Sequence, residues 1–184
     1  MMGRRARLLG IASGTLLALG GVAAVVITRT DAGYRWYLDR TYAGNFPDVK
    51  VVMPEQLARE LNAAAAPVLL DVRAPEEYAV SHLQGARLAD PGAFNPGMHS
   101  DVGRDRAIVV YCSVGYRSAK MAQRLQGLGY TNVRNLYGGI FLWYNQGRTV
   151  VGAAGGVERN VERIHPYSFM WGQFITRDGK TYQP

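Results

Sequence analysis

The chain of 184 residues has room for one ordinary domain with short extensions, and it is too short for two separate hydrophobic cores. Hydrophobic residues make up 48% of it and charged residues 19%, which excludes wholesale disorder. The single cysteine excludes an internal disulfide and a Cys-rich zinc site, and the three histidines are scattered without metal-ligand spacing. We therefore expect a folded protein that carries no metal.

The net charge of +7 is unevenly distributed along the chain. Residues 1–30 carry Arg4, Arg5, Arg7 and Arg29 and no acidic residue, which gives +4 and leaves +3 for the other 154 residues. The remainder is therefore close to neutral, and no Lys/Arg stripe interleaved with aromatic residues occurs in it. We expect no nucleic-acid partner.

The first predicted element is an apolar segment from Leu8 to Ile27, in which twenty residues pass without a charge. At about 1.5 Å per residue, a helix of about twenty residues spans the hydrocarbon core of a bilayer. The segment exceeds the ~7–15 apolar residues of a typical secretory signal, which remains the alternative. We predict an uncleaved, single-pass N-terminal membrane anchor over residues 1–30.

A juxtamembrane linker is expected next, over residues 31–48. Arginines flank the apolar segment on both sides, but the dense cluster before it favours a cytoplasmic N-terminus and a domain outside the cytoplasm. The linker is rich in aromatic residues, which either lie at the level of the lipid headgroups or pack on the domain. These residues are Tyr34, Trp36, Tyr37 and Tyr42.

Residues 49–150 alternate between apolar runs and amphipathic segments. The predicted strands are Val49–Met53, Val68–Val72, Arg87–Ala89, Ala107–Cys112 and Val133–Leu136. Predicted helices start at Pro54, Pro75, Ser118 and Gly139. The run over 107–112 is apolar on both faces, as a strand inside a parallel sheet requires. This order predicts an α/β domain with a mainly parallel sheet flanked by helices.

The only thiol, that of Cys112, stands at the carboxyl end of the strongest predicted strand, where ligand sites of parallel sheets gather. The residues between it and the next helix can turn their backbone N–H groups inward and stabilise a thiolate nucleophile. Gly115 permits a backbone conformation that a Cβ would resist, and Arg117 is suited to contact an oxyanion. The alternative is a small core cysteine.

Three motifs in this order resemble the rhodanese domains: LLDVRAPEEYAVSHLQGA (69–86), VVYCSVGYRSAKMAQRLQGLGY (109–130) and VRNLYGGIFLWYNQG (133–147). The resemblance implies a sulfurtransferase whose cysteine, here Cys112, takes up a sulfane sulfur as a persulfide and passes it to an acceptor. It implies that Arg117 contacts an oxyanion and that the loop around the sulfur binds the substrate. The loop residues are Ser113, Val114, Gly115, Tyr116 and Ser118.

The loop after Cys112 differs in two ways from the corresponding loops of other proteins with this fold. Ser113 stands where thiosulfate-using members often have a basic residue, which puts thiosulfate in doubt as the donor. Four residues separate Cys112 from Arg117, whereas phosphatases and arsenate reductases of this fold have five, so phosphatase activity is not expected. Nearby, Asp71 and Arg73 are expected to form a structural ion pair with Glu76 or Glu77, and His82 a turn-stabilising hydrogen bond.

The predicted function is a membrane-tethered sulfurtransferase without metal or organic cofactor. Its partners would be a small sulfur donor, a thiol or cyanide-like acceptor and the membrane at residues 8–27. A binding or redox-sensing module of the same fold is the alternative, and a protein partner stays open. Residues 151–184 are expected to form a Gly-rich spacer over Val151–Val157 and an aromatic tail. The tail packs on the domain, rests at the membrane surface or docks a partner, and packing is the favoured interpretation.

Overall fold

The computed structural model describes residues 30–92, 101–154 and 157–183. No helix within these ranges is long and apolar enough to cross a membrane. The predicted anchor over residues 8–27 lies outside them. The elements, in chain order, are α2 Asp31–Asn45, β1 Val51–Val52, α3 Pro54–Leu61, β2 Val68–Asp71, α4 Pro75–Val80, β3 Arg87–Leu88, β4 Ile108–Tyr111, α5 Tyr116–Gly127, β5 Val133–Leu136, α6 Gly139–Asn145, β6 Val150–Ala154, β7 Val157–Val161 and the 3-10 turn η2 Trp171–Phe174.

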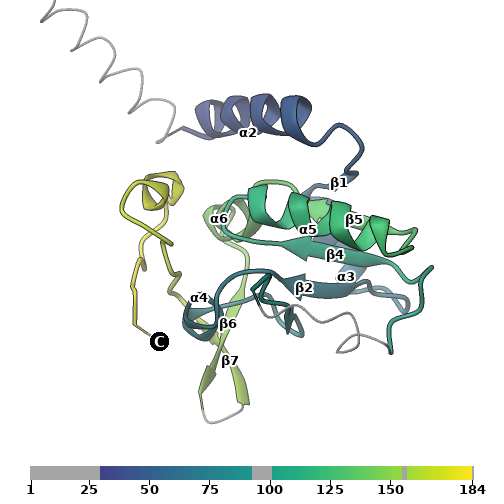
Figure 1. The fold of residues 1–184 in the computed structure, drawn as a ribbon. Coiled ribbons are helices and arrows are strands. Elements are labelled where there is room, and N and C mark those ends of the chain that lie inside the picture. Colours follow the sequence, from purple (N-terminus) through teal and green to yellow (C-terminus); the bar gives the residue numbers. More distant parts are fainter. Residues whose placement is uncertain (1–29, 93–100, 155–156, 184) are drawn as a thin grey trace, which may run out of the picture.

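Five strands form one sheet in the order β1-β5-β4-β2-β3, and every neighbouring pair is parallel. The central strand β4 is buried along its whole length, which explains why its sequence is apolar on both faces. Helices α5 and α2 lie on one side of the sheet, and α4 and the β6–β7 hairpin on the other (Figure 1). The predicted α/β fold with a parallel sheet is confirmed.

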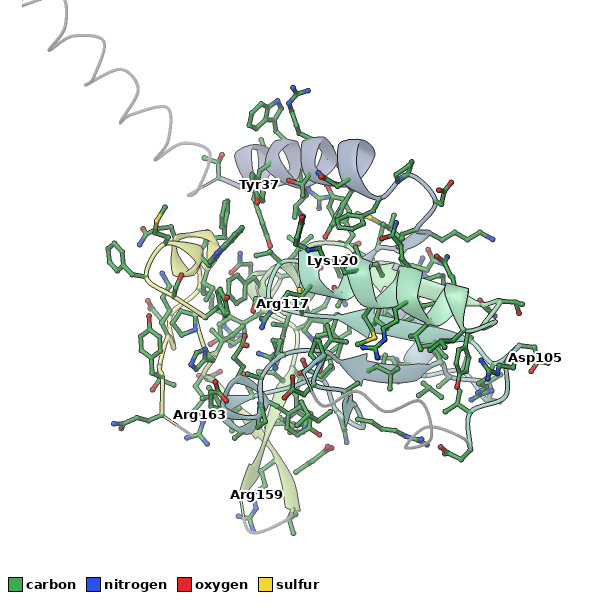
Figure 2. The ribbon with its side chains drawn as sticks, in the orientation of Figure 1. Tyr37, Asp105, Arg117, Lys120, Arg159 and Arg163 are labelled. Carbon is green, nitrogen blue, oxygen red and sulfur yellow. The ribbon has the colours of Figure 1, made fainter. Side chains whose placement is uncertain are left out.

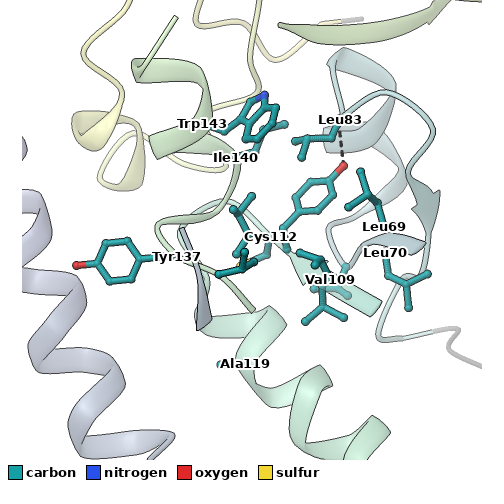
Figure 3. Packing of buried hydrophobic residues seen from close by; sticks show 14 of the residues in the cluster. Leu69, Leu70, Leu83, Val109, Cys112, Ala119, Tyr137, Ile140 and Trp143 are labelled. Carbon is teal, nitrogen blue, oxygen red and sulfur yellow. Dashed lines mark hydrogen bonds between the residues drawn. The ribbon is translucent and has the colours of Figure 1, made fainter. Parts of the chain in front are cut away.

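The hydrophobic core gathers around β4 and the start of α5 (Figure 3). Val109, Cys112 and Ala119 are almost completely buried, with 1% or less of each exposed. The backbone N–H of Leu83 donates to the hydroxyl of the buried Tyr111, which fixes the segment after α4 against β4. The backbone that carries Cys112 is therefore held by a well-packed core.

Helix α2 replaces the expected juxtamembrane linker. Tyr34, Leu38 and Tyr42 recur at every fourth position and are all buried against the domain. The hydroxyl of Tyr34 donates to the carbonyl of Gly138 at 2.8 Å. Of the two expectations for the aromatic residues, Tyr34 and Tyr42 therefore follow packing on the domain, whereas Trp36 is largely exposed.

The expected Gly-rich spacer is also absent in the described residues: β6 and β7 form an antiparallel hairpin there. Val150 and Val151 are buried, and Val151 pairs with the backbone of His82. Beyond the hairpin the tail turns back toward α2, so that η2 lies near the start of that helix, before the chain runs away from it to its C-terminal end (Figure 1). The aromatic residues of the tail lie in a turn and in η2, although their alternation suited a strand edge.

Candidate active site

Cys112 directly follows β4, and its sulfur faces the turn that leads into α5. The backbone N–H of Gly115 donates to Sγ at 3.1 Å, and the hydroxyl of Ser118 lies 3.5 Å from it. Both groups are hydrogen-bond donors to the sulfur, so they stabilise negative charge there. Of the backbone N–H groups that the sequence predicted to turn inward, that of Gly115 is seen to contact the sulfur.

The conformation of this loop depends on Gly115. Its φ of +102° is left-handed, and a Cβ at this position would overlap the hydroxyl of Tyr42 on α2. The same hydroxyl donates to the carbonyl of Val114 at 2.8 Å, and the side-chain amide of Asn135 donates to the carbonyl of Gly115 at 2.9 Å. The loop is thus held from both α2 and β5.

The start of α6 supports the loop from its other side. The N–H groups of Ile140 and Phe141 donate to the carbonyls of Cys112 and Ser113 at 2.9 and 3.0 Å. Gly139 makes this approach feasible, since a Cβ there would overlap both carbonyls. A glycine at this position therefore lets the start of α6 pack closely against the loop.

Arg117 projects from the first turn of α5 and forms a two-pronged ion pair with Glu77 of α4. Both N–O distances are 2.8 Å, and the guanidinium also donates to the hydroxyl of Ser113 at 3.0 Å. Burial raises the pKa of Glu77, but the hydrogen bonds and charge of Arg117 outweigh it and leave that pKa below its usual value. An incoming anion therefore meets a compensated ion pair, whereas the sequence had suggested only that Arg117 contacts an oxyanion.

The buried ion pair expected near Glu77 forms with different partners. The fully buried guanidinium of Arg73 pairs with Asp71 at 2.7 Å and donates to the carbonyl of Ser81. The predicted partner Glu77 binds Arg117, because the first turn of α4 directs it toward α5. The structural ion pair is present, but between Asp71 and Arg73 themselves.

A pocket of about 260 Å³ opens above the loop, slightly smaller than the ~300–1,000 Å³ of typical ligand pockets. Five of the predicted site residues line it: Cys112, Ser113, Val114, Tyr116 and Arg117. The other two, Gly115 and Ser118, contact the sulfur itself. All seven predicted residues are therefore gathered around one thiol.

Five residues of the site were not predicted. Glu77 pairs with Arg117 and compensates its charge, and the other four line the pocket: Tyr37, Thr41, Tyr167 and Trp171. The aromatic density around residues 34–42 and 165–174 was a visible signal, but nothing in the local sequence directs these segments to the cysteine. In the described part of the chain, no cluster of three or more His, Cys, Asp or Glu side chains is placed to hold a metal ion.

Comparison with known proteins agrees with this geometry. The rhodanese-like domain family profile matches residues 53–146, just over half of the chain. The chain belongs to the rhodanese-like family. A sulfurtransferase of Allochromatium vinosum is 34% identical over 107 residues, which cover 58% of this chain and 99% of the relative.

Two further relatives are larger than the rhodanese-like domain. The probable adenylyltransferase/sulfurtransferase MoeZ of Mycobacterium tuberculosis is 32% identical over 96 residues, 52% of this chain and 24% of the relative, so the chain spans about a quarter of that protein. The crystal structure of a thiosulfate sulfurtransferase from Pseudomonas aeruginosa matches with a TM-score of 0.52 and 31% identity, over 55% of this chain and 20% of that one. Relatives named sulfurtransferases support a rhodanese-type enzyme.

Proposed function

We propose that the protein is a sulfurtransferase that carries a sulfane sulfur on Cys112. The observation that carries the proposal is the sulfur itself: it receives hydrogen bonds from the loop and borders a pocket that opens to the outside. A donor sulfur entering this pocket would reach Sγ directly. The terminal sulfur of a persulfide formed there would be an anion beside the loop, where the N–H of Gly115 and the hydroxyl of Ser118 can stabilise negative charge.

The transfer follows from nucleophilic catalysis in two steps. The Cys112 thiolate attacks the outer sulfur of a donor R–S–SH, the donor S–S bond breaks, and RS⁻ leaves with the bonding electron pair. A thiolate or cyanide then attacks the outer sulfur of the Cys112 persulfide, and the Cys112 thiolate leaves in turn. The sulfur atom changes carrier without an external oxidant or reductant.

The test is the intact mass of the full-length chain before and after exposure to thiosulfate or a polysulfide. We expect a gain of one sulfur atom, which cyanide or a thiol removes. Cys112→Ser, which eliminates the only thiol, should gain no sulfur and should unfold at the same denaturant concentration as the wild type. Sulfur transfer that persists in Cys112→Ser would refute the mechanism.

A redox-sensing or binding module is the second candidate. It is favoured by the compensation of Arg117 by Glu77, which leaves no unpaired cation at the pocket for an anionic sulfur donor. An oxidised Cys112 could be resolved only by an external thiol, because the chain has no second cysteine. A thiol that is readily alkylated but accepts no sulfur from either donor would favour this candidate.

Membrane attachment is the remaining part of the proposal. Residues 8–27 form an uncleaved anchor, and the rhodanese-like domain lies outside the cytoplasm. Support comes from the length and apolarity of this segment and from the arginines before it. The expressed chain should stay in the membrane fraction after a carbonate wash and should become protease-accessible from the outer side. Release into the wash, or protection in intact spheroplasts, would contradict the anchor and the orientation respectively.

A further inference from the structure

The pocket above Cys112 is completed by two segments that lie outside the family domain. Four of its nine lining residues fall outside residues 53–146. Tyr37 and Thr41 come from α2, and Tyr167 and Trp171 come from the C-terminal tail. Figure 2 shows Tyr37 pointing from α2 toward the body of the domain, on the side where Arg117 lies. The chain therefore adds its own walls to a shared reactive loop.

These walls are fixed in place and are parts of the fold. The ring of Phe174 stacks on Tyr34 at 4.8 Å and lies 5.2 Å from Tyr37, which joins the tail to α2. Trp171 meets Tyr37 edge-on at 6.0 Å. The side chain of Asn145 in α6 donates to the carbonyl of Phe174 at 2.7 Å and so anchors the tail to the domain.

Tyr167 is held in an uncommon backbone conformation. Its φ of +62° is left-handed, which is rare for an aromatic residue, and its backbone N–H donates to the ring of His165 at 3.0 Å. This conformation places the ring 4.6 Å from the guanidinium of Arg117. Local strain of this kind concentrates at functional sites.

The charge of the pocket disfavours a small dianion. Arg117 is the single charged residue among those lining the pocket within the described chain, and both of its prongs bind Glu77. Tyr167 covers the same guanidinium. A dianion such as thiosulfate would lose water without gaining an unpaired cation, which is costly. Four aromatic residues line the same space, three of them from outside the family domain, and their rings offer an apolar group a favourable surface.

We infer that Tyr37, Tyr167 and Trp171 form an aromatic box that binds an apolar, preferably aromatic, organic group of the sulfur donor. This inference rests on the proposed sulfur transfer and names its donor class: an organic sulfane compound whose carbon body fills the pocket while its terminal sulfur meets Cys112. The reactive loop performs the transfer, and the box determines which donor is used.

The test compares two donors that share a reacting group and a single charge, benzenethiosulfonate and methanethiosulfonate. The Cys112 thiolate attacks the sulfane sulfur, the bond to the sulfonyl sulfur breaks, and the sulfinate leaves with the electron pair. Cyanide then removes the sulfur as thiocyanate. The rate of thiocyanate formation by the full-length chain in mild detergent gives kcat/KM for each donor. The donor ratio is kcat/KM for benzenethiosulfonate divided by kcat/KM for methanethiosulfonate. Because the intrinsic reactivities of the donors affect this ratio equally in every variant, a change in the ratio between variants reports a change in donor binding.

Two variants remove different rings of the box. Trp171→Ala removes the tail ring that contacts α2, and Tyr167→Asn removes a half-exposed ring while keeping a residue that tolerates left-handed backbone. Phe169→Ala is the matched control, because Phe169 is an aromatic residue of the same segment, is 80% exposed and does not line the pocket. We expect the donor ratio to fall about fivefold in each box variant, which equals ~1 kcal/mol, and to stay unchanged in the control.

The outcomes separate the two proposals. If the wild type and both box variants turn over with the same donor ratio, the aromatic box is refuted while sulfur transfer stands. If neither donor loads sulfur onto Cys112 of the wild type, the proposed function fails and the box fails with it. If Trp171→Ala loses its cooperative unfolding transition, the donor ratio of Tyr167→Asn decides whether the aromatic box binds the donor, because Tyr167 is half-exposed and its replacement should leave the fold intact.

Discussion

The reactive loop and the walls of the pocket are built by different means. Residues 112–118 form a local structure: a strand end, a left-handed glycine and a helix start lie within seven consecutive positions. The walls come from residues 37–41 and 167–171, which lie about 130 residues apart in the chain and meet through aromatic contacts. The loop lies inside the family match and both wall segments lie outside it.

This contrast assigns separate tasks to the two regions. The loop supplies groups that any sulfane transfer needs, namely a nucleophile and donors to its sulfur. In the proposed transfer, the walls would contact the group that is attached to that sulfur. Contacts across the boundary, such as Tyr42 on Val114 and Tyr167 on Arg117, are where the two regions depend on each other.

The largest effect is expected from Gly115→Ala, at the point where α2 and the loop meet. A Cβ makes the positive φ cost ~1–2 kcal/mol and overlaps the hydroxyl of Tyr42, which adds ~1–3 kcal/mol of overpacking. We expect the free energy of unfolding to fall by about 3 kcal/mol, measured by urea titration, and sulfur uptake to fall with it. Adding Tyr42→Phe should restore part of the loss, since it removes the overlapped hydroxyl.

Gly127→Ala is the control for this substitution. Gly127 ends α5 and has an ordinary helical backbone, and a Cβ added to it would meet no neighbouring atom within 4 Å. The change should be neutral or stabilising by up to ~1 kcal/mol. Equal effects at the two glycines would show that α2 does not constrain the loop.

A smaller effect is expected from Glu77→Gln, which breaks the ion pair with Arg117. Loss of hydrogen bonds to a charged partner costs ~1.5–3 kcal/mol. The pKa of Glu77 is lowered in the folded state, so its contribution is complete above the unfolded value of about 4.3 and is lost as pH falls through the folded value. Urea unfolding between pH 7 and pH 3 should therefore show a shallower acid loss in the variant than in the wild type.

The same variant changes the charge seen by a donor. Without Glu77 the guanidinium of Arg117 is no longer compensated, so kcat/KM for thiosulfate should rise several-fold relative to benzenethiosulfonate. Glu60→Gln is the control, because Glu60 forms a similar pair with Arg134 and does not line the pocket. An unchanged thiosulfate preference in Glu77→Gln would mean that the ion pair does not govern donor choice.

The parallel sheet was predictable because each of its strands has a local sequence pattern. Buried parallel strands are continuous apolar runs, and the expected Val133–Leu136 coincides with β5. Helix α5 starts at Tyr116, two residues before the expected Ser118, because Gly115 in its left-handed conformation already directs the chain into the helix. Helix α2 was missed, although Tyr34, Leu38 and Tyr42 recur at every fourth position as in an amphipathic helix.

The site was predictable only as far as the loop extends. Cys112 and its sulfur contacts follow from seven consecutive residues, whereas the partner of Arg117 comes from a helix 40 residues earlier. The buried His82 shows the same limit: its predicted turn contact, to the carbonyl of Tyr78, is local, while its other ring nitrogen contacts Glu158 in the hairpin. Pairings at such separation leave no pattern in a single sequence.

The smallest effect is expected from Tyr34→Phe, which asks whether α2 is a structural part of the domain. The ring and its stacking on Phe174 remain, and only the hydrogen bond to the carbonyl of Gly138 is lost. Because that carbonyl is in a buried contact, the free energy of unfolding should fall by about 1 kcal/mol, measured by urea titration. Tyr182→Phe, at a position 56% exposed, should leave it unchanged. A flexible linker over residues 31–48 would make both substitutions neutral, whereas a loss confined to Tyr34→Phe places α2 within the cooperative fold that supports the pocket.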